Sequence, residues 1–178
     1  IKINIMQTCV SQYNKIRKMD IADGPGVRVS IFMQGCSFNC KNCFNPETHD
    51  FAGGKDFTQD TVNRVLKLCD KDYVEGLSIL GGEPMHPKNI RGTTELAKAF
   101  KEKFPNKSLW VWSGFTFDRD LKDKDALKYI DVLVDGQYVD ELHNPKLEWR
   151  GSSNQRVIDV QESLKANKVI LFNKKNVN

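Results

Sequence analysis

Hydrophobic residues recur along the chain in short runs, and these runs predict strands that alternate with helices. In Val27–Met33, apolar and polar positions alternate and several residues are β-branched, which is typical of a strand. Three more short apolar runs, each ending at a glycine-containing turn, predict strands at Leu77–Leu80, Ser108–Trp112 and Ile130–Val134. The run Val169–Phe172 predicts an edge strand.

The segments between these strands carry apolar residues at helical spacing. They predict helices at Thr58–Cys69, with Thr58 as N-cap, at Thr94–Phe104, and over the short stretch Asp118–Leu127. Strand–helix units in series imply parallel strands joined by crossover helices. The 178-residue chain is too short for eight such units, so we expect an α/β fold with an open or partial barrel. No linker interrupts the pattern, which predicts a single domain over residues 1–178 with a polar tail.

Four polar or glycine-rich motifs directly follow the predicted strands. They are the cysteine-containing loop after Val27–Met33, Gly81–Pro84, Ser113–Gly114 and Asp135–Gly136. In folds with parallel strands, the ligand site forms at the carboxyl ends of the strands. We therefore expect all four motifs on one rim of the molecule.

The loop after the first of these strands contains three cysteines, Cys36, Cys40 and Cys43, within eight residues. Three thiolates from one loop predict a metal site with one coordination position left open, since closed zinc sites and fully ligated iron–sulfur clusters use four ligands. Two other interpretations stay open on spacing alone. One is a zinc site completed by a distant His or by Cys69, and the other is an electron carrier whose fourth cysteine lies elsewhere.

Composition narrows the class of protein further. Hydrophobic residues make up 39% of the chain, including ten Phe and three Trp, which is enough for a core. The net charge is +4, and the dispersed basic residues form no aromatic-interleaved basic face that would indicate nucleic-acid binding. We find no membrane-length apolar run and no signal-peptide pattern. Five mostly clustered cysteines fit a reducing compartment, so we expect a cytoplasmic protein without membrane or nucleic-acid partners, and we assign no role to Cys9.

These motifs together resemble the radical S-adenosylmethionine superfamily, in which Cys-x3-Cys-x2-Cys is followed by Gly-Gly-Glu-Pro. Within it, the chain is similar to glycyl-radical-enzyme activases, and looks most like those of anaerobic (class III) ribonucleoside-triphosphate reductase. The resemblance covers about residues 16–164 and implies a partial (βα)6-type parallel barrel. The motifs that narrow the match are Asp23–Arg28, Cys43–Thr48, Trp112–Thr116, Val134–Tyr138 and Trp149–Arg156.

The resemblance implies a radical mechanism. A [4Fe–4S] cluster on the three cysteines would bind S-adenosylmethionine through its fourth iron and cleave it reductively. The resulting 5′-deoxyadenosyl radical would remove hydrogen from one glycine of the partner reductase, with flavodoxin or ferredoxin as electron donor. The alternatives are activation of another glycyl radical enzyme, radical chemistry on a small molecule, and a non-enzymatic iron–sulfur electron carrier.

The resemblance also assigns roles to individual residues. Cys36, Cys40 and Cys43 are the cluster ligands, and the cofactor contacts are Asn42, Cys43, Phe44, Gly81, Gly82, Glu83, Ser113 and Asp135. Arg150, Ser152, Asn154 and Gln155 would receive the partner or substrate, with a structural polar network as the alternative. Many members have an adenine-holding aromatic residue just before the third cysteine, whereas this chain has Asn42 there and Phe44 after it.

Overall fold

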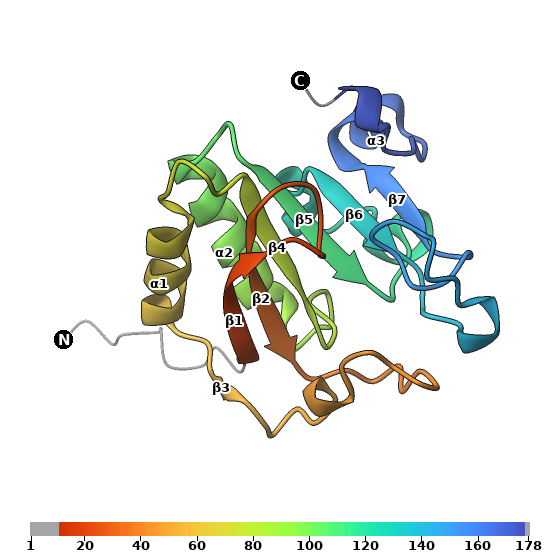
Figure 1. The fold of residues 1–178 in the computed structure, drawn as a ribbon, viewed down its shortest axis with the longest axis horizontal. Helices are drawn as coiled ribbons and strands as arrows, with labels where there is room; N and C mark the ends of the chain where they lie inside the picture. Colours follow the sequence, from red (N-terminus) through yellow and green to blue (C-terminus); the bar gives the residue numbers. More distant parts are fainter. Residues whose placement is uncertain (1–10, 177–178) are drawn as a thin grey trace.

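Seven strands form one open, mixed β-sheet in the computed structural model, which describes residues 11–176 (Figure 1). Cys9 lies outside the described residues. The strand order is β3-β1-β2-β4-β5-β6-β7, and the outermost strands β3 and β7 do not pair with each other. The strands are β1 (Gln12–Asp20), β2 (Arg28–Gln34), β3 (Lys55–Asp56), β4 (Gly76–Gly81), β5 (Ser108–Ser113), β6 (Val132–Asp135) and β7 (Arg156–Asp159).

The four central strands, β2, β4, β5 and β6, run parallel, as the sequence pattern predicts. Their register brings one row of apolar residues into line, because Ile31 pairs with Ile79, Ile79 with Val111, and Val111 with Leu133. All four side chains are fully buried. This shared register makes the four strands end at the same edge, from which the orange loop after β2 and the cyan loop after β6 extend (Figure 1).

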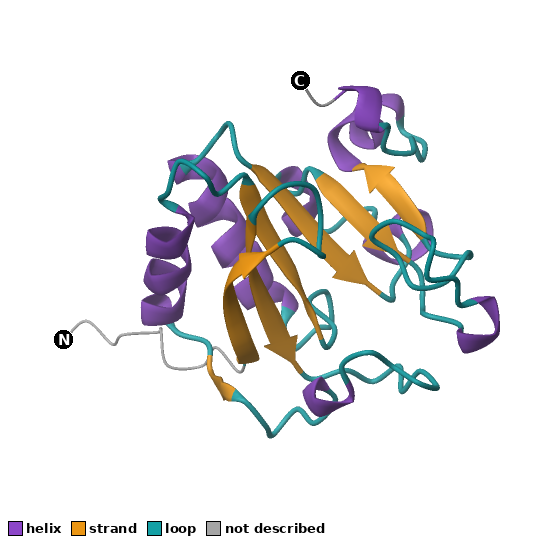
Figure 2. Cartoon of the chain, in the orientation of Figure 1, coloured by secondary structure: helices purple, strands orange, loops and turns teal. Residues whose placement is uncertain are grey.

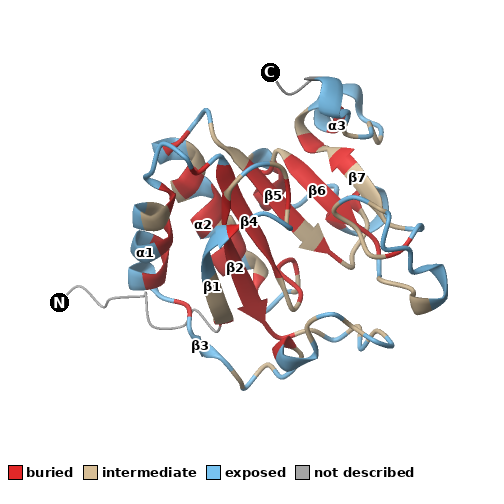
Figure 3. Ribbon diagram, in the orientation of Figure 1, coloured by how far each residue is buried: buried red, intermediate tan, exposed pale blue. Residues whose placement is uncertain are grey.

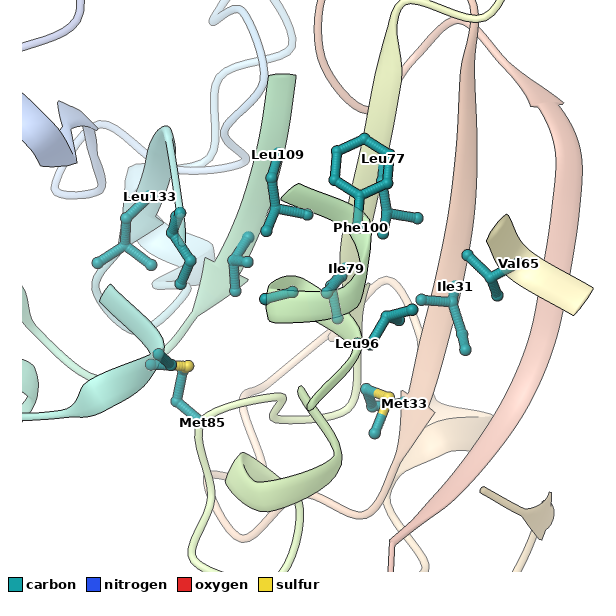
Figure 4. Close-up of a cluster of buried hydrophobic side chains, with 14 of the residues drawn as sticks. Ile31, Met33, Val65, Leu77, Ile79, Met85, Leu96, Phe100, Leu109 and Leu133 are labelled. Carbon is teal, nitrogen blue, oxygen red and sulfur yellow. The ribbon is translucent and has the colours of Figure 1, made fainter. Parts of the chain in front are cut away.

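Helices α1 (Gln59–Cys69) and α2 (Ile90–Lys103) cover one face of the sheet (Figure 2). Val65 of α1 and Leu96 and Phe100 of α2 point toward the central strands and belong to the main core (Figure 4). Thr58 begins α1 as predicted, and its backbone N–H donates to Thr61 Oγ1 at 3.1 Å. Helix α3 (Val160–Ala166) follows β7. Short turns occupy η2 (Pro46–Thr48), η3 (Phe117–Leu121), η4 (Asp125–Lys128), η5 (Asp140–Leu142) and η6 (Lys174–Asn176).

Two predicted elements are wrong. The expected helix at Asp118–Leu127 is replaced by the π-helical turn η3 and the 3-10 turn η4. The Asp120 carboxylate accepts hydrogen bonds from both the backbone N–H and the hydroxyl of Thr116, a local bond that competes with a regular helix. The expected edge strand at Val169–Phe172 is reduced to one isolated bridge, between Leu171 and Ile158.

Other elements were missed or misplaced. Helix α2 begins at Ile90, four residues before the predicted Thr94, with Asn89 at its N-cap position. Strands β1 and β7 were not predicted, and both pair antiparallel at the flanks of the parallel strands. The pattern of β1 is masked because the strand includes Lys15 and Arg17, whose cationic groups lie 4.7 and 4.8 Å from the centre of the Phe32 ring.

The second face of the sheet carries a smaller aromatic cluster. Trp110, Val132 and Val134 are buried there. Trp112, Trp149, Val157 and Phe172 pack against them. Burial is concentrated in the strands, whereas the loops at the strand ends are mostly exposed (Figure 3). Among the helices of residues 11–176, we find none with the length and apolar character needed to cross a membrane.

A fully buried arginine ties the beginnings of three strands together. Arg28 opens β2, and its guanidinium donates to Ser78 Oγ at 2.7 Å, to Leu77 O at 2.9 Å, and to both the carbonyl and the hydroxyl of Ser108. It also donates to Pro25 O at 3.2 Å, which fixes the loop between β1 and β2. This loop leads toward the ligand cavity described below.

Replacing Arg28 with Ala should therefore destabilise the fold. The change leaves several buried acceptors without a donor, and each such group costs on the order of 1–3 kcal/mol. We expect the free energy of unfolding, measured by urea denaturation, to fall by about 3 kcal/mol. The exposed Arg64 of α1 is the matched control, and Arg64→Ala should change stability by less than about 0.5 kcal/mol. Equal effects of the two substitutions would contradict this account of Arg28.

Candidate metal centre and ligand cavity

A cavity of about 590 Å³ opens where the parallel strands end. Its volume falls in the range of about 300–1,000 Å³ that is common for small-molecule sites. Ten of the predicted site residues line it: Cys36, Cys40, Cys43, Phe44, Gly81, Gly82, Glu83, Ser113, Arg150 and Gln155. Asn42, Asp135, Ser152 and Asn154 do not line it. The expectation of one common rim is thus confirmed for the cysteine loop and the turns after β4 and β5, and also for the turn after β6, where Gly136 lines the cavity.

The cysteine loop leaves β2 through a turn that only glycine accommodates. Gly35 has φ +103°, and a Cβ there would lie 2.1 Å from the ring of Phe51. Asn39 and Asn42 adopt left-handed backbone conformations, with φ of 51° and 54°, which asparagine tolerates better than most residues. These turns curl the loop so that Cys36, Cys40 and Cys43, all partly exposed, face one cavity.

Protein hydrogen bonds hold both ends of this loop. Gly35 N–H donates to Thr48 O at 2.7 Å, and Cys36 N–H donates to His49 O at 3.1 Å. Glu83 N–H donates to Gly35 O at 2.8 Å, which joins the cysteine loop to the turn after β4. The loop is therefore positioned by its neighbours in the fold.

The buried side chain of Asn89 reinforces this junction, and the sequence analysis missed it. Its amide Nδ2 donates to Gln34 O at 3.0 Å, Gly35 O at 3.3 Å and Glu83 O at 3.0 Å. The only sequence signal was a polar residue just before helix α2, where an N-cap is common. Its side chain instead joins the two halves of the candidate site.

The three thiols are a suitable donor set for a thiolate-bound iron–sulfur group. Burial raises the pKa of Cys36 and Cys43, so these thiols need a metal to ionise readily near neutral pH. Within residues 11–176, no three His, Cys, Asp or Glu side chains are grouped around a position for a single metal ion. Cys69 is fully buried in the core, and burial raises its pKa to about 12, as befits a structural cysteine.

The turn after β4 packs directly against the start of the cysteine loop. Gly81 has φ +105°, and a Cβ on Gly82 would lie 2.5 Å from Gly35 O. Gly82 N–H donates to Met33 O at 2.9 Å. Any further ligand hydrogen bond at Gly82 would therefore have to use its carbonyl oxygen. The glycines make this close backbone contact possible beside the cavity.

Glu83 links the turns after β4 and β5 through a buried carboxylate. Its Oε1 accepts from Ser113 Oγ at 2.7 Å and from Met85 N–H at 3.0 Å, and its Oε2 accepts from Gly114 N–H at 2.6 Å. Burial raises the pKa of Glu83 to about 7, despite these three donors. Both Glu83 and Ser113 thus have structural partners, and their predicted cofactor contacts stay predictions.

Asp135, at the end of β6, is completely buried and engaged in a structural ion pair. Its carboxylate accepts from Arg156 Nε at 2.9 Å, from an Arg156 terminal nitrogen at 2.6 Å and from Phe117 N–H at 2.8 Å. These bonds raise the pKa of Arg156 further above its ordinary value. Asp135 does not line the cavity. Its predicted cofactor contact therefore gains no support from the cavity lining and remains a prediction.

The cysteine loop also contacts the long loop that follows β6. Asn42 Nδ2 donates to Asp140 Oδ2 at 2.8 Å, so the side chain bridges two loops outside the cavity. The exposed ring of Phe44 packs on Tyr138, with 5.1 Å between centroids. Tyr138 and Trp149 line the cavity and were not predicted as site residues. Their placement depends on the path of this long loop, which local periodicity does not reveal.

The predicted partner segment forms an internal polar network. Gln155 Oε1 accepts from the N–H groups of Gly151 and Ser152, and Gln155 Nε2 donates to Gly136 O. An Arg150 guanidinium nitrogen donates to Ser153 O and Gln155 O. Ser152 Oγ accepts from Val139 N–H, and Asn154 Nδ2 donates to Gln137 O. The structural alternative therefore accounts for these contacts, while Arg150 and Gln155 still face the cavity.

Glu83 should make stability depend on pH. Its raised pKa means that the folded protein binds this proton more tightly than the unfolded chain does. Protonated Glu83 therefore contributes to the free energy of unfolding. This contribution is complete below about pH 4.5 and is lost as pH rises through about 7. Asp23 makes stability depend on pH in the same direction, because burial and the neighbouring Asp20 raise its pKa to about 7.

In metal-free protein, Glu83→Gln should remove roughly half of the fall in unfolding free energy between about pH 5 and pH 8. Urea denaturation at a series of pH values measures this fall. Glu102→Gln, at an exposed position of α2, is the matched control and should leave the pH dependence as it is. An unchanged pH profile in Glu83→Gln would rule out Glu83 as a source of the dependence.

Comparison with known proteins identifies the family. The family description of a 4Fe-4S single cluster domain matches residues 22–158. The anaerobic ribonucleoside-triphosphate reductase-activating protein of Enterobacteria phage T4 is 40% identical over 145 residues, covering 82% of this chain and 92% of the relative. The proteins of the same name from Vibrio cholerae and Escherichia coli K12 are 38% and 34% identical, over 80% and 82% of this chain and 94% and 96% of theirs. The chain belongs to the family of anaerobic ribonucleoside-triphosphate reductase-activating proteins.

Proposed function

We propose that this protein activates an anaerobic ribonucleoside-triphosphate reductase by generating its glycyl radical through reductive cleavage of S-adenosylmethionine. The observation that carries the proposal is the presence of three thiols, Cys36, Cys40 and Cys43, on one cavity wall beside the Gly81–Glu83 turn. Family membership supports the same reaction. The protein is accordingly an enzyme.

The three cysteines would hold one [4Fe–4S] cluster and leave its fourth iron for the amino and carboxylate groups of S-adenosylmethionine. When bound, the cluster and S-adenosylmethionine together supply one-electron reductive cleavage of the sulfonium. The cysteine loop orients the cluster because its ends are fixed to Thr48 and His49. Glu83 lines the cavity with a buried carboxyl group, which would lie near the cofactor's amino group.

Aromatic side chains would separate the reacting atoms from water. Phe44 and Tyr138 pack together at the cavity, and Trp112 and Trp149 line it as well. Phe44 would replace the aromatic residue that is absent at Asn42, with its ring available to the adenine. Apolar side chains around a reactive carbon radical limit its side reactions with water, which is one purpose of excluding water from an active site.

We further propose that the open sheet is a partial (βα)6-type barrel and that the chain forms a single domain. The parallel strands β2, β4, β5 and β6, with helices α1 and α2 on one face, support this assignment. A glycine-bearing segment of the reductase is the proposed substrate, with Arg150 and Gln155 as its candidate contacts in the cavity. A flavodoxin or ferredoxin would be the electron donor in the cytoplasm.

The cluster assignment is tested by substitution of single cysteines. Cys36→Ser, Cys40→Ser and Cys43→Ser should each lower iron from about four per chain to less than about one after anaerobic reconstitution, because a cubane needs all three thiolates. Iron analysis and the brown absorbance of the cluster measure this loss. Cys69→Ser is the control, since Cys69 lies in the core away from the cavity, and it should retain the iron. Loss of iron only in Cys69→Ser would favour a different metal site.

The reaction itself is tested by anaerobic EPR. Reconstituted protein, S-adenosylmethionine, a strong reductant and the reductase should give an organic radical doublet, because the abstracted hydrogen leaves an unpaired electron on glycine Cα. The doublet should collapse when the reductase contains deuterated glycine. Cofactor cleavage without any reductase radical would instead favour a small-molecule substrate. A cluster that forms but cleaves no cofactor would favour an electron carrier.

A further inference from the structure

The segment after helix α3 folds back alongside β7 at the edge of the sheet, and we call residues 168–174 the strap. Asn167, in a left-handed conformation with φ 51°, reverses the chain direction at the end of α3. Asp159 N–H then donates to Ile170 O, and Phe172 N–H donates to Val157 O, both at 2.9 Å. The matched family region ends at residue 158, so the strap lies beyond it.

One residue of the strap inserts an aromatic ring into the cluster on the second face of the sheet. The Phe172 ring lies 5.1 Å from that of Trp110, edge to face, and 6.0 Å from that of Trp149. Trp110 and Trp149 lie 4.8 Å apart, also edge to face. Such aromatic pairs are favourable beyond the burial of apolar area. The three rings therefore form one mutually supported group.

Trp149 connects this group to the cavity, because it also belongs to the cavity lining. Its backbone is left-handed, with φ +59°, which is unfavourable for a bulky residue and persists only where neighbours enforce it. Trp112 Nε1 donates to Trp149 O at 2.7 Å. Lys174 of the strap lies 4.7 Å from the centre of the Trp149 ring. Strap and sheet thus hold Trp149 from two sides.

The next residue carries the constraint further into the cavity. Arg150 lines the cavity directly, and its guanidinium bonds to the carbonyls of Ser153 and Gln155. A shift of the Trp149 backbone would move Arg150 with it, since the two are adjacent in the chain. The strap therefore affects the cavity indirectly, through Trp149. Neither Leu171 nor Phe172 lines the cavity.

We propose that Phe172 is a positioning residue, which holds Trp149 and Arg150 in place as one wall of the cavity and so strengthens the binding of S-adenosylmethionine. This inference rests on the proposed function for the identity of the ligand. It gives a function to the strap, which lies outside the residues that the family description matches. The wall is held in place before the cofactor arrives, which lowers the ordering cost of binding.

The test compares Phe172→Ala with Leu171→Ala. Leu171 immediately precedes Phe172 in the strap, and its side chain is 62% exposed, so its removal leaves the aromatic group intact. Hydrogen exchange of the 144–153 region, measured by mass spectrometry on metal-free protein, reports opening of the wall. We expect exchange about tenfold faster in Phe172→Ala, and unchanged exchange in Leu171→Ala.

Affinity for the cofactor is the second readout. After anaerobic reconstitution, Phe172→Ala should bind S-adenosylmethionine about tenfold more weakly by equilibrium dialysis, with iron content unchanged. Phe172→Tyr keeps the ring and should restore both exchange and affinity. Lys174→Gln removes the cation near Trp149 and should shift both readouts in the same direction, by a smaller factor. This variant remains informative if Phe172→Ala folds poorly.

Several outcomes would overturn the inference. Exchange of 144–153 that is unchanged in both Phe172→Ala and Lys174→Gln would show that the strap does not hold the wall. Faster exchange with unchanged affinity would show that the wall does not act on the cofactor. If the unaltered protein fails to bind iron and S-adenosylmethionine at all, the proposed function is wrong, while the exchange result still decides whether the strap holds the wall.

Discussion

The hydrogen bonds of one buried amide, that of Asn89, hold the two halves of the site together. Its side chain donates to carbonyls at the end of β2, at the first residue of the cysteine loop and in the turn after β4. The backbone of the same residue starts helix α2, which packs into the main core. The position of the thiols relative to the Gly81–Glu83 turn therefore follows from the packing of a core helix. Buried amides of this kind specify geometry because an unpaired alternative is costly.

A second buried polar group extends this arrangement across the sheet. The Glu83 carboxylate bonds Ser113 and Gly114, and so joins the turns after β4 and β5. Asp135 and Arg156 form the corresponding link between the end of β6 and the start of β7. Two neighbouring pairs of strands are thus joined by side chains at this edge, while the strands themselves are joined by backbone pairing. Charged groups at the rim act here as parts of the scaffold.

Local signals in the sequence predicted the chemistry better than they predicted the enclosure of the site. Cys36–Cys43 and Gly81–Pro84 were recognisable because metal spacing and tight turns depend on neighbouring residues. The parallel strands were found for a similar reason, since their apolar runs are short and continuous. Strand β1 was missed because it includes charged residues, and only the folded structure shows their cationic groups over the ring of Phe32. Tyr138 and Trp149 were missed because only the tertiary path of a long loop brings them to the cavity.

Position in the sequence also proved insufficient to fix the direction of a side chain. Asn42 and Asp135 lie within motifs of the site, yet their side chains bond Asp140 and Arg156 outside the cavity. Contacts within the protein account for the side chains of both Ser113 and Asp135. Turn chemistry and ligand chemistry use the same residue types, and only three-dimensional packing distinguishes them.

The cysteine loop takes its shape from protein bonds at Gly35 and Cys36 and from the left-handed turns at Asn39 and Asn42. All of these constraints are made within the polypeptide itself. Because Glu83 N–H also donates to Gly35 O, a substitution that displaces the turn after β4 would shift the thiols without contacting any of them.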